Sequence, residues 1–200
     1  MAQKKVIEID KTMAEHNQIN PSEVIEQCLV RSFGLDKYQA IQSDLQKTNI
    51  FLDESFQKKY NAFYKVRRNS EWRNIYYELF EKLKKETSEI SFRYILEYMY
   101  LRTGNIEASF SSKMLATLNP DFPIWDQYVL KNLGITLPTT KEKKSVDLIV
   151  EYYSQICDWY KKYIESDEGK KCVEVFNQTL SHYKWISPIK KIDFFLWGKR

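Results

Sequence analysis

Residues 109–134, SFSSKMLATLNPDFPIWDQYVLKNLG, predict two consecutive helices joined by a short turn. Lys113 falls in the middle of the first helix, among apolar side chains. Pro120 ends that helix, because proline lacks a backbone N–H and excludes helical geometry at the residue before it. We expect Asp126 to be the N-cap of the second helix and Gly134 to follow its C-cap. The stretch therefore places one amine and one carboxylate on consecutive helices.

Lys113 and Asp126 admit two interpretations. In the functional one, burial disfavours the charged amine of Lys113, which lowers its pKa and frees it to act as a nucleophile. Asp126, at a helix N-terminus, stays ionised and stabilises a cationic intermediate. In the structural one, Asp126 only caps its helix, which contributes about 1 kcal/mol. Lys113 then extends to solvent or pairs with a carboxylate.

The composition of the chain favours an all-α helical bundle. Its 200 residues include only five glycines and five prolines, while 15% are aromatic. Average proteins contain more glycine and proline, so this composition indicates long helices packed through large side chains. The sequence has neither an apolar run long enough to cross a membrane nor a secretion leader, and we expect a soluble, cytoplasmic protein that does not enter a membrane.

The cysteines and histidines predict no metal centre and no cofactor. Cys28, Cys157 and Cys172 are odd in number and form no CxxC pair, which is typical of reduced thiols in the cytoplasm. His16 and His182 lie far apart and lack the spacing of metal ligands.

The periodic apolar positions divide most of the chain into helices. A helix is expected from Pro21 to just before Gly34, and others are expected at 36–47, from 53, from 70, at 91–103, from 145 and from about 170. The helix at 91–103 is apolar on most sides, so we expect it to be central. Residues 6–10, VIEID, are the single candidate strand, and 138–144 is the clearest loop. We expect residues 1–90 to form an N-terminal helical layer and 91–200 the core, or the whole chain to form one continuous domain.

Basic residues gather in two places. The total of 31 Lys and Arg against 27 Asp and Glu is only a mild excess. The C-terminal segment 183–200 mixes aromatic residues with cations, and its candidate DNA-binding residues are Lys190, Lys191, Lys199 and Arg200. A second cluster comprises Lys65, Arg67 and Arg68. Cations among aromatic rings suit a phosphate backbone with exposed bases. The alternative for the C-terminal segment is that its apolar run at 194–197 docks on the core.

The segments KMLATLN, from Lys113, and PIWDQYV, from Pro123 to Val129, resemble the core of the helix-hairpin-helix base-excision DNA glycosylases. The resemblance covers these segments and the all-α background. It implies that Asp126 is the essential carboxylate and that Lys113 is the Schiff-base nucleophile. A flipped base would enter an aromatic pocket, and Trp125 and Tyr128 are the nearest candidates to bind it. The same segments are also similar to a set of bacterial proteins that carry SFxSK and PIWD.

The region that corresponds to the hairpin of this superfamily is Gly104 to Ser112. Glycosylase hairpins hold a DNA phosphate with backbone N–H groups of a glycine-rich turn. Glu107 lies inside the corresponding region here, and a carboxylate at that place is expected to repel phosphate.

Two functions follow from the sequence. The first is a DNA-binding protein that resembles DNA glycosylases and abasic-site lyases, with Lys113 and Asp126 as catalytic residues. The alternative is a non-catalytic helical protein that binds a protein or a nucleic-acid partner.

Overall fold

The chain is all-α, as the composition predicts. The computed structural model describes residues 20–23, 25–26, 34–86, 89–136 and 145–198, and within them no residue is in a strand. The helices are α3 (Leu35–Leu45), α4 (Glu54–Tyr64), α5 (Ser70–Lys84), α6 (Phe92–Thr103), α7 (Ala108–Leu118), α8 (Gln127–Asn132), α9 (Val146–Glu165), α10 (Asp167–Thr179), the 3₁₀ turn η2 (Ser181–Tyr183) and α11 (Pro188–Gly198). The candidate strand at 6–10, the loop at 138–144 and most of the helix expected from Pro21 lie outside the described residues.

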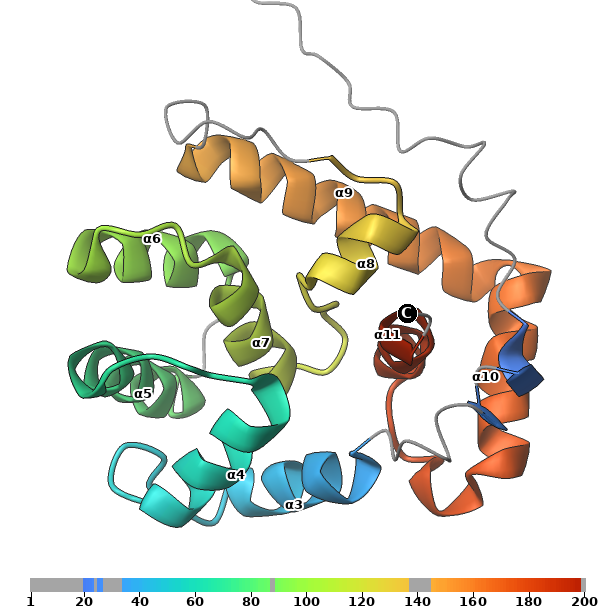
Figure 1. The fold of residues 1–200 in the computed structure, drawn as a ribbon, viewed down its shortest axis with the longest axis horizontal. Helices are drawn as coiled ribbons and strands as arrows, with labels where there is room; N and C mark the ends of the chain where they lie inside the picture. Colours follow the sequence, from blue (N-terminus) through green and yellow to red (C-terminus); the bar gives the residue numbers. More distant parts are fainter. Residues whose placement is uncertain (1–19, 24, 27–33, 87–88, 137–144, 199–200) are drawn as a thin grey trace, which may run out of the picture.

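The helices form two groups around the loop that joins α7 to α8. On one side, α3 to α6 follow one another, with α3 against α4, α5 against α6, and α6 against α7 (Figure 1). On the other side, α11 packs against α8, α9 and α10, and Figure 1 shows it end-on within this group. One cluster of buried apolar side chains includes residues from both groups, from Ile25 to Leu196. The division of the chain at residue 90 stays a prediction.

The predicted helix ends around the α7–α8 loop are confirmed. Asn119, directly before Pro120, has the extended backbone angles φ −134° and ψ 101°. Asp126 is the N-cap of α8, and its side chain accepts a hydrogen bond from the N–H of Tyr128 at 2.9 Å. Gly134 follows the C-cap with φ 67°, a left-handed conformation that glycine adopts without a steric penalty.

The expectation that the helix at 91–103 is central is wrong. In α6, Leu101 is 81% exposed, and Tyr94 and Tyr100 are more than 40% exposed. The central helices are instead α7, whose residues 111–117 are all buried, and α11, whose residues 189–196 are all buried. An apolar pattern shows that a helix has neighbours, but it does not decide which helix has neighbours on every side.

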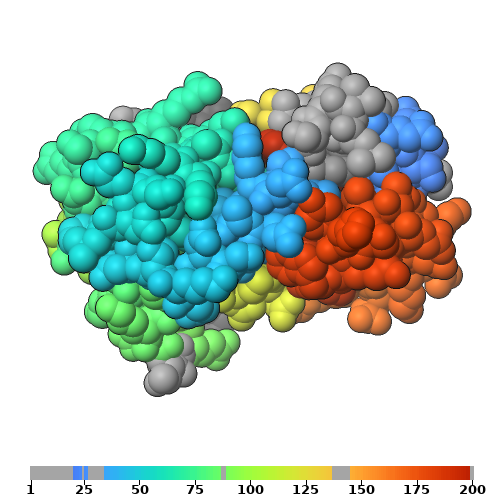
Figure 2. All heavy atoms as spheres, turned by 90° about the horizontal axis from the view of Figure 1, so that it is seen from below, coloured from blue at the N-terminus to red at the C-terminus, as the bar shows by residue number. Residues whose placement is uncertain are grey.

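The two groups of helices also meet at the surface. Figure 2 shows α3 beside the chain that follows α10. The hydroxyl of Tyr183 donates a hydrogen bond to the carboxylate of Asp36. Trp185 stacks on Tyr38 with an interplanar angle of 1° and ring centroids 5.8 Å apart. Within the described part of the chain, no helix combines the length and the apolar character that crossing a membrane requires.

Candidate functional site

A pocket of about 320 Å³ lies where the end of α4, α7, the start of α8 and α11 meet. Both residues that the sequence singles out, Lys113 and Asp126, line it. The complete lining is Phe63, Tyr64, Lys65, Arg67, Lys113, Ile124, Asp126, Gln127, Tyr128, Val129, Lys190, Asp193, Phe194 and Trp197. The pocket thus combines aromatic walls with four cations and two carboxylates.

Lys113 presents an almost fully buried amine. The residue is 9% exposed, and its Nζ donates a hydrogen bond to the carbonyl oxygen of Tyr64 at 3.3 Å. The Nζ also lies 5.3 Å from the centroid of the Phe110 ring. Burial lowers the pKa of Lys113 below its ordinary value, Asp126 opposes that shift, and the charge of Lys190 adds to it. A lysine with a lowered pKa is neutral in a larger fraction of molecules and is therefore a better nucleophile.

Asp126 is half-buried at the edge of the same pocket. One of its oxygens, Oδ1, accepts the N–H of Tyr128 and so caps α8. Its charge partly offsets the lowering of the Lys113 pKa by burial, so the two groups interact electrostatically across the pocket. The second carboxylate oxygen of Asp126 is not used by the cap bond.

A second lysine and aspartate form a buried ion pair on α11. Lys190 is 2% exposed and Asp193 is 4% exposed, and Lys190 Nζ lies 3.3 Å from Asp193 Oδ2. The ammonium group of Lys190 is also surrounded by aromatic rings, with centroids at 5.3–5.8 Å: those of Tyr38, Tyr64 and Phe194. Cation–π attraction and the ion pair together compensate the burial of this charge.

Asp193 connects α11 to α9 and to the loop before α8. Its Oδ1 accepts hydrogen bonds from the hydroxyl of Tyr160 at 2.6 Å and from the N–H of Ile124 at 3.3 Å. Burial raises the pKa of Asp193 above its ordinary value, and the contacts with Lys190, Tyr160 and Ile124 act in the opposite direction.

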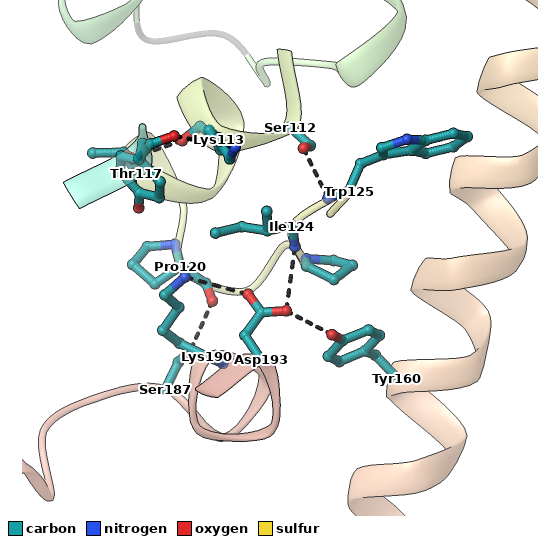
Figure 3. A network of polar contacts seen from close by, with 12 residues as sticks. Ser112, Lys113, Thr117, Pro120, Ile124, Trp125, Tyr160, Ser187, Lys190 and Asp193 are labelled. Carbon is teal, nitrogen blue, oxygen red and sulfur yellow. Dashed lines mark hydrogen bonds and ion pairs between the residues drawn. The ribbon is translucent and has the colours of Figure 1, made fainter. Parts of the chain in front are cut away.

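Two serines hold the same loop at other points, as Figure 3 shows. The Oγ of Ser112 on α7 accepts the N–H of Trp125 at 2.8 Å. The Oγ of Ser187, directly before α11, donates to the carbonyl oxygen of Pro120 at 2.6 Å. The loop that carries Asp126 is therefore fixed from both α7 and α11, which sets the position of its carboxylate relative to Lys113.

The two candidate base-binding residues have different positions. Tyr128 lines the pocket, as expected. Trp125 does not line it, because its side chain turns away from the pocket and is 5% exposed. Its ring instead packs edge-on against Tyr152, with centroids 6.4 Å apart and an interplanar angle of 79°. Trp125 is therefore a core residue, and the aromatic walls of the pocket come from α4, α8 and α11.

Lys190 and Lys191, the two described candidates of the C-terminal segment, do not contribute to an exposed basic surface. Lys190 lines the pocket inside the ion pair with Asp193. Lys191 is 3% exposed, its Nζ donates to the carbonyl oxygen of Lys184 at 2.9 Å, and burial lowers its pKa. The apolar residues around them dock α11 on the core, which was the alternative interpretation of this segment. Lys199 and Arg200 lie outside the described residues.

Glu107 does not face solvent as a repulsive charge. It is 4% exposed, and one carboxylate oxygen pairs with Arg68 at 2.7 Å. The other oxygen accepts the indole N–H of Trp72 at 3.0 Å. The negative charge is therefore compensated within the fold by Arg68, and the expected repulsion of a phosphate stays a prediction.

The pair on α11 has one local signal in the sequence. Lys190 and Asp193 are three residues apart, and this spacing brings side chains together on one face of a helix. Charged residues within an otherwise apolar helix are paired when they are buried. The contacts of Asp193 with Tyr160 and Ile124 depend on packing between distant segments.

No group of three or more His, Cys, Asp and Glu side chains within the described residues could hold a metal ion. Cys157 is half-buried and Cys172 is buried, both as free thiols, and Cys28 lies outside the described residues. Comparisons with protein-family models, with curated proteins and with solved structures each found no match.

Proposed function

We propose that this protein binds DNA and acts as a DNA glycosylase or abasic-site lyase, with Lys113 as the amine nucleophile and Asp126 as the carboxylate that stabilises positive charge. One observation carries the proposal: a buried amine with a lowered pKa shares a pocket with a carboxylate and aromatic walls. Perturbed amines in pockets are candidates for covalent catalysis.

The chemistry requires an electrophilic sugar carbon. At an abasic site, the neutral amine of Lys113 adds to the aldehyde carbon C1′, and the carbinolamine takes a proton from solvent and loses water to leave an iminium cation. Removal of a proton from C2′ then lets the C3′–O bond break, and its electron pair leaves with the phosphate. At an intact lesion, the amine would instead displace the base from C1′, and the departing base would take a proton from solvent. In both reactions Asp126 balances the cationic charge on the sugar.

The pocket suits a nucleotide that has left the base stack. Its volume of about 320 Å³ is within the range of small-molecule sites. Phe63, Tyr128, Phe194 and Trp197 contribute aromatic rings to its walls, and such rings stack on a flipped base. Phe63 lies on α4 and Tyr128 lies on α8.

Borohydride trapping tests the proposal. A duplex with one abasic site is incubated with the protein and sodium borohydride, which reduces an iminium to a stable secondary amine. We expect a covalent complex on a denaturing gel with the wild-type protein and none with Lys113→Gln. Lys191→Gln is the matched control, because Lys191 is also a buried lysine with a lowered pKa but does not line the pocket. Trapping that is equal in both variants would refute the assignment of Lys113.

Asp126→Asn tests the carboxylate separately from the cap. Asparagine caps a helix about as well as aspartate, so the melting temperature should hardly change. A neutral amide does not balance a developing cation, so turnover should fall sharply. Full activity in Asp126→Asn would limit this residue to its structural role.

The structural contacts of the same two residues favour a second function, that of a non-catalytic helical protein that binds a protein or a nucleic-acid partner. Lys113 donates to Tyr64, and Asp126 caps α8. A non-catalytic protein would bind DNA with a normal salt dependence, show no covalent adduct, and be unaffected in binding by Asp126→Asn.

A further inference from the structure

The turn between α4 and α5 presents cations at the edge of the pocket. Its sequence from Lys65 to Asn69 is KVRRN, and Lys65, Arg67 and Arg68 are exposed while Val66 is buried. Lys65 and Arg67 line the pocket, and because they are also exposed they mark its opening. This turn therefore lies between solvent and the amine of Lys113.

The side chain of Arg68 is engaged within the fold. Arg68 pairs with Glu107 at 2.7 Å, and its guanidinium lies 5.2 Å from the centroid of the Phe110 ring. Within the described part of the chain, neither Lys65 nor Arg67 has an ion-pair partner. Their charges are therefore available to a ligand.

The charges deeper in the pocket do not neutralise this opening. The carboxylate of Asp193 is paired with Lys190, and that of Asp126 acts on Lys113. With Lys113 neutral, Lys65, Arg67 and Lys190 still outnumber the two carboxylates of the lining. Lys65 and Arg67 leave an excess of positive charge where the pocket meets solvent, and this charge suits an anion.

Lys65 also has an unusual backbone conformation. Lys65 is the C-cap of α4 with φ 57° and ψ 43°, and among the described residues it is the one non-glycine with positive φ. Glycine adopts this conformation without the steric penalty that a side chain brings. A lysine at this position therefore carries a backbone strain that glycine would relieve.

We propose that Lys65 and Arg67 bind the backbone phosphates of a DNA strand whose nucleotide enters the pocket. This inference rests on the proposed function and adds the contact that holds the strand. The turn begins directly after Tyr64, whose carbonyl oxygen accepts a hydrogen bond from the amine of Lys113. A strand held by Lys65 and Arg67 has its sugar, which lies between two phosphates, next to the nucleophile. Cations that contact phosphate contribute to binding of every sequence and make it depend on salt.

The test uses Lys65→Gly and Arg67→Ala, singly and together, with fluorescence anisotropy on a labelled duplex that carries a reduced abasic analogue. Each lost phosphate contact should lower the slope of log affinity against log salt by about 1, and the double variant by about 2, between about 50 and 200 mM salt. Lys170→Ala is the control, because Lys170 is exposed on α10, outside the pocket lining, and the change removes the same charge. Lys65→Gly should melt at the wild-type temperature or above it, since glycine relieves the strain, while DNA binding becomes weaker.

The results separate this inference from the proposed function. Unchanged affinity and salt slope in the double variant, or no binding of the duplex by the wild type at low salt, would overturn the phosphate contact. A normal loss of binding in these variants together with no borohydride adduct in the wild type would support the phosphate contact and refute the lyase. Reductive alkylation of Lys113 by free 2-deoxyribose, which has no phosphate, should proceed equally in the wild type and the double variant.

A final arm identifies the source of the phosphate. Inorganic phosphate and a nucleoside 5′-monophosphate are used as competitors against the labelled duplex. We expect both to compete only weakly, because a strand offers several phosphates at once. Tight binding of the free nucleotide that is lost equally in the double variant would show that the cations serve a small phosphorylated ligand, and the assignment to a strand would be wrong.

Discussion

Replacing Asp193 by asparagine removes one charge of a buried ion pair and keeps the shape of the side chain. Lys190 is 2% exposed, so its charge would remain buried beside a neutral amide. Breaking a buried pair in this way costs about 3–5 kcal/mol. For a chain of this size that corresponds to a fall in Tm of about 6–20 °C. Urea denaturation, followed by circular dichroism, gives the free energy of unfolding for comparison.

The double variant Lys190→Met with Asp193→Asn tests whether charge is the cause. Methionine is apolar and packs well against aromatic rings, and the rings of Tyr38, Tyr64 and Phe194 surround this position. With no unpaired charge left, the double variant should recover most of the stability that Asp193→Asn loses. A cost below about 1 kcal/mol for Asp193→Asn, or a double variant no more stable than the single one, would refute this reasoning.

Further changes test the loop, the amine and the α9–α10 junction. Ser112→Ala leaves the buried N–H of Trp125 without its acceptor and should cost about 1–3 kcal/mol in urea denaturation. Ser111→Ala should be neutral or stabilising, because the buried Ser111 hydroxyl has no hydrogen-bond partner among the described residues. The pKa of Lys113 is lowered in the folded protein, so between that pKa and the ordinary value of 10.5 the unfolded chain binds more protons and stability rises with pH. Lys113→Met lacks this titrating amine, so its free energy of unfolding does not gain from the rise in pH. Any stability advantage of Lys113→Met over the wild type should therefore shrink from about pH 8 to about pH 10, and a widening difference would contradict the lowered pKa. Gly169→Ala would place a Cβ 1.9 Å from the carbonyl oxygen of Tyr163, and a cost of about 3 kcal/mol or more is expected; a normal melting curve would show that the two helices do not approach so closely.

The helix ends could be predicted from sequence because their signals are local. Pro120 excludes helix at the residue before it, Asp126 bonds to an N–H two residues ahead, and Gly134 needs only its own backbone freedom. Ser91 and Ser145 likewise cap α6 and α9 through N–H groups three residues away. None of these contacts depends on how the helices pack, so a single sequence suffices to find them.

The environment of the site could be predicted only in part, because it depends on packing between distant segments. The sequence predicts Lys113 on an apolar helix face, but the acceptor of its hydrogen bond, the carbonyl of Tyr64, is 49 residues away. The ion pair on α11 has a local spacing, yet its burial depends on α9 and on the loop before α8. Trp125 and Tyr128 lie three residues apart in sequence, and only Tyr128 reaches the pocket. The direction of a side chain outside a regular helix is not fixed by sequence spacing alone.

Peptide mapping of the borohydride-reduced complex tests the central claim most directly. The wild-type protein is trapped on an abasic oligonucleotide, the complex is digested with nuclease and protease, and the modified residue is located by mass spectrometry. We predict that the residual sugar mass is found on Lys113 alone, and that Lys65, Lys190 and Lys191 are unmodified. An adduct on another lysine, or no adduct at any lysine while the duplex is bound, would contradict the assignment of Lys113 as the nucleophile.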